Sequence, residues 1–118
     1  MELLIKQLDT LIDEEYDRAE LKFGAVNNSD HESYAILLEE VEEAEYEVRA
    51  LRSYLQSFWL RVKAKEIDST ESRKDKERSL VMLQQTATFA AAEYIQVAAM
   101  CVKARRTIAC DKRARMEE

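Results

Sequence analysis

Two short segments of the chain each hold a pair of side chains that could bind a metal ion. Glu40 and Glu43 lie three residues apart in EVEEA (40–44), and Glu93 and Gln96 lie three residues apart in EYIQV (93–97). Residues three apart are neighbours on one face of a helix. Carboxylate and amide oxygens are hard ligands of the kind that Mg²⁺ and Mn²⁺ prefer. The pattern indicates either a divalent-metal site or a solvated acidic helix face.

The segments that carry these pairs have regular apolar seams. Apolar residues recur at alternating steps of three and four over residues 34–62 and again over residues 80–108, as the a and d positions of heptads do. With the first residue of each seam at position a, both pairs fall at positions g and c. Two helices packed through these seams would turn the pairs toward one another, and the converging carboxylates would repel each other without a cation.

The composition predicts that these seams belong to long helices. The chain has 118 residues, one glycine and no proline, with 36% charged and 47% hydrophobic residues, a mixture typical of an all-α protein. Gly24 suits the end of a first helix, and Ser29 with Glu32 forms a capping box at the start of a second. We predict one helical domain over 1–118, with helices at about 2–23, 30–65 and 71–112, a loop at 66–70 and a second capping box at Asp68 and Glu71. Such a long-helix bundle would be completed by oligomerisation.

The net charge and the types of segment in the sequence limit which partners and compartments we expect. The net charge of -6 argues against a nucleic-acid partner. We expect no membrane partner and a cytoplasmic protein, because no signal peptide or apolar run of membrane-spanning length is found. The basic C-terminal end is either a solvated helix end or a phosphate-attracting surface. Its cations are Lys103, Arg105, Arg106, Lys112, Arg113 and Arg115.

The acidic pattern resembles that of a known enzyme family. Glu39, Glu40 and Glu43 form EExxE, and a later helix carries Glu93 and Gln96 as ExxQ. EExxE followed by ExxD is the signature of the MazG-like, all-α nucleoside triphosphate pyrophosphohydrolases, and the likeness covers about residues 29–106. It implies a helical bundle that is a homo-dimer or homo-tetramer. It also implies Mg²⁺, or Mn²⁺, as cofactor and the conversion of a nucleoside triphosphate to a monophosphate and pyrophosphate.

The resemblance also implies roles for individual residues. Glu40, Glu43 and Glu93 would be metal ligands, joined by Gln96, while Glu39 would be a further ligand or would orient the attacking water. The family has aspartate where this chain has Gln96, so the activity would be weakened because an amide brings no negative charge.

Two further points come from the residues themselves. Lys103 lies two helical turns beyond Gln96, a spacing that fits a phosphate ligand. The alternative function is a catalytically inactive module for helical oligomerisation or protein interaction, which the long seams favour.

Overall fold

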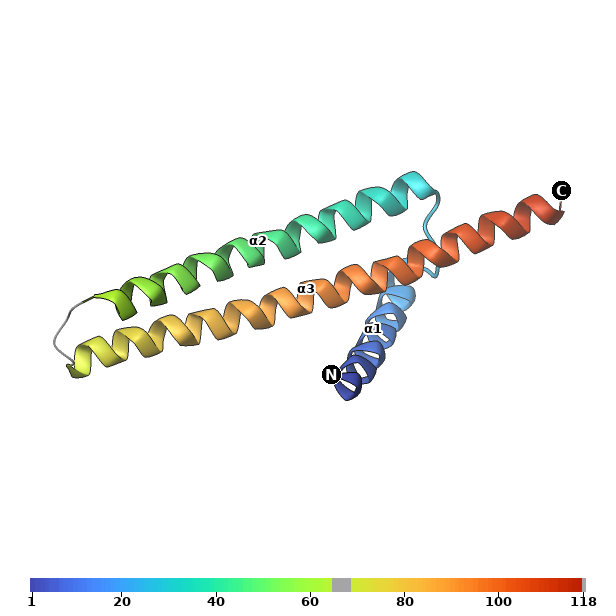
Figure 1. Ribbon diagram of the computed structural model, residues 1–118. Coiled ribbons are helices and arrows are strands. Elements are labelled where there is room, and N and C mark those ends of the chain that lie inside the picture. The colour runs from blue at the N-terminus through green and yellow to red at the C-terminus, as the bar shows by residue number, and fades with distance from the viewer. Residues whose placement is uncertain (65–68, 118) are drawn as a thin grey trace. The chain divides into compact units, whose positions relative to one another are not determined.

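The computed structural model describes residues 1–64 and 69–117, with side chains up to Asp111. Three helices account for nearly all of them: α1 (Glu2–Phe23), α2 (Asp30–Lys63) and α3 (Thr70–Glu117), as Figure 1 shows. No strand occurs in these ranges, so the predicted all-α class is confirmed. The helix starts agree with the prediction within one residue. Most of the predicted loop at 66–70 lies outside the described residues.

The connector between α1 and α2 uses the residues that the sequence indicates. Gly24 has φ 90° and ψ 167°, a positive φ that glycine tolerates best, and its N–H donates to the Glu20 carbonyl at 2.9 Å. The Ser29 hydroxyl accepts a hydrogen bond from the Glu32 N–H at 3.1 Å. The Glu32 carboxylate accepts instead from the Asn28 amide at 3.0 Å. Half of the predicted capping box is therefore formed, and it is enough to start α2.

The described residues form two compact units, which we treat separately. The first unit comprises Met1–Glu42 and Glu93–Glu118, and therefore contains α1, the start of α2 and the later part of α3. The second unit comprises Glu43–Ala92. The second unit is a helical hairpin made of the end of α2 and the start of α3 (Figure 1).

In the first unit, α1 crosses α3 and is fixed there by Tyr16. The Tyr16 side chain is 2% exposed, and its hydroxyl donates to the Ala25 carbonyl at 2.9 Å. The Arg106 guanidinium lies 4.3 Å from the centre of the Tyr16 ring and donates to its hydroxyl at 3.0 Å. One side chain thus joins α1 to its own connector and to α3 by burial, hydrogen bonding and a cation–π contact.

A buried polar network ties the connector to α3. The Asn27 N–H donates to the Thr107 hydroxyl oxygen at 2.9 Å, and the Asn27 side-chain amide donates to the Ser33 hydroxyl at 2.8 Å. The Thr107 hydroxyl in turn donates to the Lys103 carbonyl at 2.8 Å. These bonds satisfy backbone and hydroxyl groups that would otherwise be buried without partners, and they hold the start of α2 against α3.

In the second unit, α3 begins at a serine cap. The Ser69 hydroxyl accepts from the Ser72 N–H at 3.1 Å, whereas the predicted cap, Asp68, lies outside the described residues. An ion pair of 3.1 Å between Arg61 and Asp75 joins the two helices near this end. Both of these side chains are partly exposed, so the pair contributes about 1 kcal/mol or less.

In the single chain, one of the two rows of the predicted α3 seam is exposed. The a-position residues are all exposed: Leu80, Ala87, Tyr94, Cys101 and Ile108. The buried row lies one residue earlier, at Ser72, Ser79 and Thr86. Small side chains let two helix backbones approach closely, whereas large apolar side chains in that row would hold them apart. Burial on this helix therefore follows residue size more than hydrophobicity.

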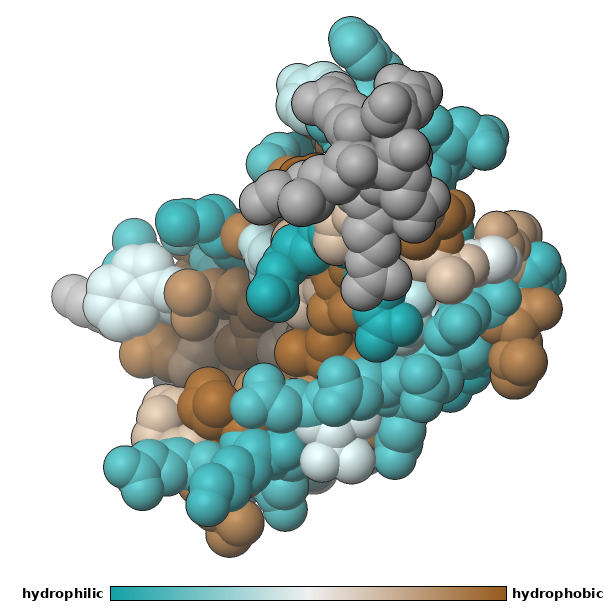
Figure 2. Space-filling view, turned by 90° about the vertical axis from the view of Figure 1, so that its right-hand side faces the viewer, coloured by the Kyte–Doolittle hydropathy of each residue, from teal (hydrophilic) through white to brown (hydrophobic). Residues whose placement is uncertain are grey.

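As a result, many large apolar side chains reach the surface, and Figure 2 shows hydrophobic residues exposed among hydrophilic ones. Phe89 is 58% exposed, Tyr94 49% and Ile108 56%. On the end of α2, Leu55, Trp59, Leu60 and Val62 are exposed to a similar degree. Within the described residues, no helix combines the length and the apolar character needed to cross a lipid bilayer.

Candidate metal centre and adjoining cavity

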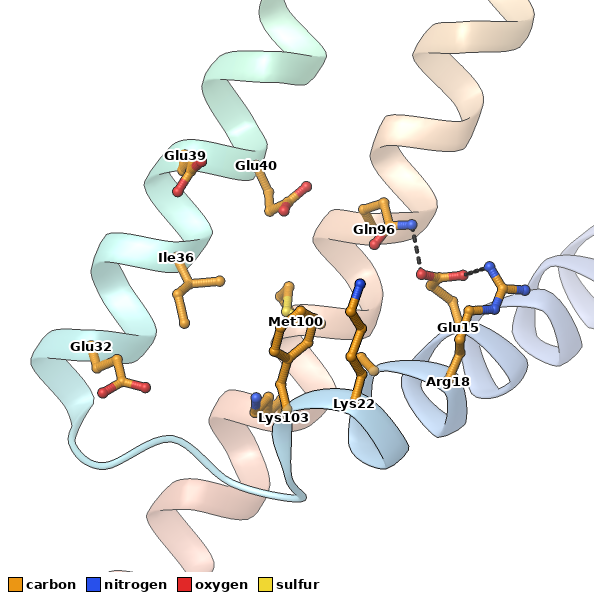
Figure 3. A pocket seen from close by; sticks show the side chains of 12 residues that line it. Glu15, Arg18, Lys22, Glu32, Ile36, Glu39, Glu40, Gln96, Met100 and Lys103 are labelled. Carbon is orange, nitrogen blue, oxygen red and sulfur yellow. Dashed lines mark hydrogen bonds and ion pairs between the residues drawn. The ribbon is translucent and has the colours of Figure 1, made fainter.

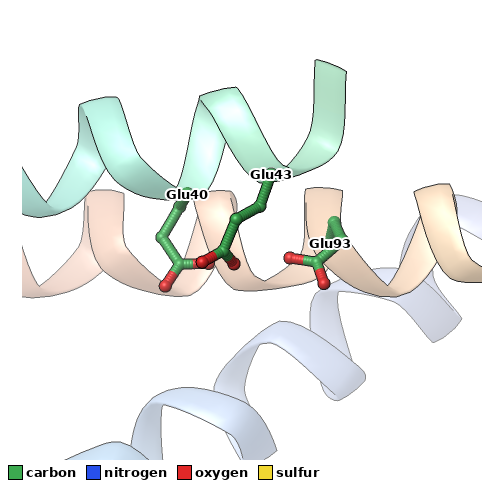
Figure 4. A group of neighbouring side chains, drawn as sticks. All are labelled: Glu40, Glu43 and Glu93. Atoms are coloured by element: carbon green, nitrogen blue, oxygen red, sulfur yellow. The ribbon is translucent and has the colours of Figure 1, made fainter. Parts of the chain in front are cut away.

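Three of the four predicted metal ligands come together. Glu40 on α2 and Glu93 on α3 are half-buried residues of the first unit, and Glu43 is one turn further along α2. One carboxylate oxygen from each of the three lies within 4.8 Å of the others, as Figure 4 illustrates. The matched positions of these glutamates in their heptads account for this proximity.

The donor set fits a hard divalent cation. Three carboxylate oxygens bring up to three negative charges into one small volume, and like charges this close repel one another. A divalent ion would relieve that repulsion, and Mg²⁺ and Mn²⁺ both favour oxygen ligands with water completing the shell. Acidic groups also cluster on solvated helix faces, so a function needs a second feature beside the carboxylates.

That second feature is a cavity of about 620 Å³ in the first unit, shown in Figure 3. All three helices line it, and Glu40 belongs both to its wall and to the carboxylate group. The side chains that it shares with the sequence prediction are Glu39, Glu40, Gln96 and Lys103. The candidate metal centre therefore adjoins a space of the size that small-molecule ligands occupy.

Gln96, the fourth predicted ligand, is held by α1. Its side-chain amide N–H donates to the Glu15 carboxylate at 2.7 Å, and Arg18 forms an ion pair of 2.8 Å with the other oxygen of the same carboxylate (Figure 3). Because the nitrogen of Gln96 is engaged with Glu15, the atom left for a metal or a ligand is its carbonyl oxygen. Its predicted role as a metal ligand would use that oxygen.

The Gln96–Glu15 bond makes a testable prediction. Gln96→Asp restores the acidic residue of the resembled signature, but it replaces an N–H donor with a carboxylate beside Glu15. We expect the metal-free variant to be less stable by about 1–3 kcal/mol at pH 7, because a hydrogen bond to a charged acceptor is lost and two like charges face each other. Urea unfolding in EDTA measures this difference. Equal stability of the variant and the native protein would contradict the hydrogen bond. Gln96→Glu keeps the length of the side chain, so it is the matched control for the shorter aspartate.

The remaining predicted residues line the same cavity. Glu39 is exposed on α2, and Lys103 on α3 is 5% exposed. Of the other basic residues near the C-terminal end, Arg105 and Arg106 are both exposed, and Arg106 also lies over the Tyr16 ring. The side chains of Lys112, Arg113 and Arg115 lie outside the described residues.

The contribution of α1 to the cavity was not predicted from the sequence. Glu15, Arg18 and Lys22 line the cavity together with Phe23. Their spacing of three and four residues marks one charged stripe beside the apolar seam of α1, and this stripe is the signal that could have identified them. The stripe does not indicate which other helix α1 would face.

Comparison of the chain with protein-family models, with curated proteins and with solved structures finds no match.

Proposed function

We propose that this protein is a MazG-like, divalent-metal-dependent pyrophosphohydrolase of nucleoside triphosphates. The observation that supports the proposal most is the meeting of Glu40, Glu43 and Glu93 within 4.8 Å, at the edge of a cavity of about 620 Å³. Carboxylates alone would suit many roles. Carboxylates beside a cavity that also holds cationic and apolar side chains suit a ligand with phosphates and an organic body.

In this proposal the three glutamates would hold Mg²⁺ or Mn²⁺, and the carbonyl oxygen of Gln96 would be a further, neutral ligand. Such an ion would neutralise phosphate charge and lower the pKa of bound water. Glu39 accepts a proton from the attacking water as the water oxygen bonds to the α-phosphorus. The bond from that phosphorus to the bridging oxygen breaks, and pyrophosphate leaves with its electron pair. We expect weak activity, because Gln96 adds no charge to the ligand set.

The exposed apolar residues of α2 and α3 support a homo-dimer or homo-tetramer, since association would remove them from water. The same residues favour a second candidate function, a catalytically inactive helical oligomerisation or interaction module. In that case the glutamates would be a solvated acidic face. The two candidates differ in whether any nucleotide is cleaved.

The test is hydrolysis by the purified native protein. Ribonucleoside and deoxyribonucleoside triphosphates are incubated separately with Mg²⁺, with Mn²⁺ and with EDTA, and products are separated by ion-exchange chromatography. The proposal expects monophosphate and pyrophosphate in equal amounts, only with metal, from at least one triphosphate. Release of diphosphate and inorganic phosphate would point to attack at the γ-phosphorus and contradict the proposed chemistry. No cleavage of any triphosphate would leave the interaction module as the better account.

A further inference from the structure

Lys103 is a lysine of low exposure that lines the cavity with no anion beside it among the described residues. Its side chain is 5% exposed, and its ammonium makes no hydrogen bond or ion pair with any residue that the structure describes. Only its backbone carbonyl is engaged, by the Thr107 hydroxyl at 2.8 Å. The only buried side-chain nitrogen or oxygen without a partner among the described residues is Asn27 Oδ1, so the Lys103 ammonium is reached by solvent in the cavity. An ammonium that meets the cavity without a carboxylate partner is available to an anionic ligand.

The cavity provides space for an anionic ligand beside Lys103. Lys103 lines it, and so does Lys22 of α1, whose ammonium lies 5.2 Å from the centre of the Phe23 ring (Figure 3). Neither ammonium has a carboxylate partner among the described residues. The wall has four carboxylates. Glu15 accepts from Gln96 and Arg18, and Glu32 accepts from Asn28. The other two are Glu39 and Glu40, of which Glu40 belongs to the carboxylate group.

Lys103 is also separated from the candidate metal centre. It follows Glu93 by ten residues on α3, which corresponds to about 15 Å of helix rise. The apolar side chains of Met100 and Ile36 line the cavity as well. Glu40 and Lys103 thus lie toward different ends of the cavity, with apolar wall available to a ligand's body (Figure 3).

We propose that the Lys103 end of the cavity binds the phosphate group of a small organic phosphate, without a divalent metal. Lysine recognises phosphate as a point charge, and burial strengthens the attraction because the local dielectric is low. The apolar wall at Ile36 and Met100 suits the organic part of such a ligand. This inference goes beyond the proposed hydrolysis, because it needs neither the carboxylate group nor a metal ion.

The test uses inorganic phosphate as the probe, in EDTA, with thermal unfolding and the ³¹P linewidth as the two measurements. Lys103→Met keeps most of the buried aliphatic volume and removes the charge. The native protein should gain about 5 °C at phosphate concentrations about ten times Kd, and its phosphate signal should broaden. Lys103→Met should show neither effect.

Two controls make the result specific. Lys6→Met removes a cation from the exposed surface of α1, away from the cavity, and should keep the full response to phosphate. Glu43→Ala should also keep it, since the proposed anion site does not use the metal ligands. An equal response in native protein and Lys103→Met would place phosphate elsewhere and overturn the inference. So would the absence of a response in the native protein, or a response that needs Mg²⁺; the hydrolysis assay would judge the proposed function separately.

Discussion

Replacing Glu43 by alanine is expected to abolish the rise in melting temperature that Mg²⁺ or Mn²⁺ gives to the native protein. One carboxylate oxygen of Glu43 lies within 4.8 Å of those of Glu40 and Glu93, so the variant leaves two ligands of the three. A ligand that binds only the folded state stabilises it by RT ln(1 + [L]/Kd). At ten times Kd this is about 1.4 kcal/mol, or roughly 5 °C for a chain of this size. Differential scanning calorimetry with and without metal measures it.

Glu42→Ala is the matched control for this prediction. Glu42 is the adjacent exposed glutamate on α2 and is not part of the carboxylate group. Its variant should keep the whole metal-dependent rise. In EDTA, Glu43→Ala should melt at or above the native temperature, because a like charge has been removed from the group. If Glu42→Ala and Glu43→Ala respond to metal alike, the carboxylate group is not the site.

Tyr16→Ala is expected to cost about 3–5 kcal/mol of unfolding free energy, the range for large aromatic side chains removed from a core. Tyr16 is 2% exposed and is one of the two largest fully buried side chains among the described residues. Its loss would leave a cavity between α1 and α3 and would release Arg106 from the ring. Urea unfolding followed by far-UV circular dichroism measures the change.

Tyr16→Phe separates packing from hydrogen bonding at the same position. The ring stays, while the bonds from the hydroxyl to the Ala25 carbonyl and from Arg106 to the hydroxyl are lost. We expect a loss of about 1–2 kcal/mol, since the Ala25 carbonyl loses its donor. Tyr46→Ala is the control, because Tyr46 is 64% exposed and should change stability by about 0.5 kcal/mol or less. Equal losses in Tyr16→Ala and Tyr46→Ala would contradict the role of Tyr16 in holding α1.

The features that were predictable from the sequence are those set by local rules. Gly24 and Ser29 mark helix ends through backbone conformation and capping, which depend on a few neighbouring residues. The proximity of Glu40 and Glu93 also followed, because both occupy the same heptad position on helices that pack together. A straight helix keeps its heptad register over many residues. The sequence pattern therefore predicts which side chains of two packed helices lie near each other.

The features that were missed depend on how close two helices come. Ser79 and Thr86 are buried while Leu80 is 44% exposed, which hydrophobic periodicity alone predicts the other way round. Nor does the stripe of Glu15 and Lys22 indicate that α1 closes a cavity against α2 and α3. Which face of a helix is buried depends on packing between segments far apart in the chain. Patterns among neighbouring residues do not contain this information.

The long-range hydrogen bonds of the first unit limit the order in which the chain can fold during synthesis. Asn27 bonds to Thr107 across 80 residues, Gln96 bonds to Glu15 across 81, and Arg106 bonds to Tyr16 across 90. During synthesis none of these bonds can form until the later part of α3 has left the ribosome. The hairpin of the second unit has all its residues available earlier. Until then Tyr16 lacks its contact with Arg106 of α3. In this interval a nascent chain is most exposed to chaperones, proteases and aggregation.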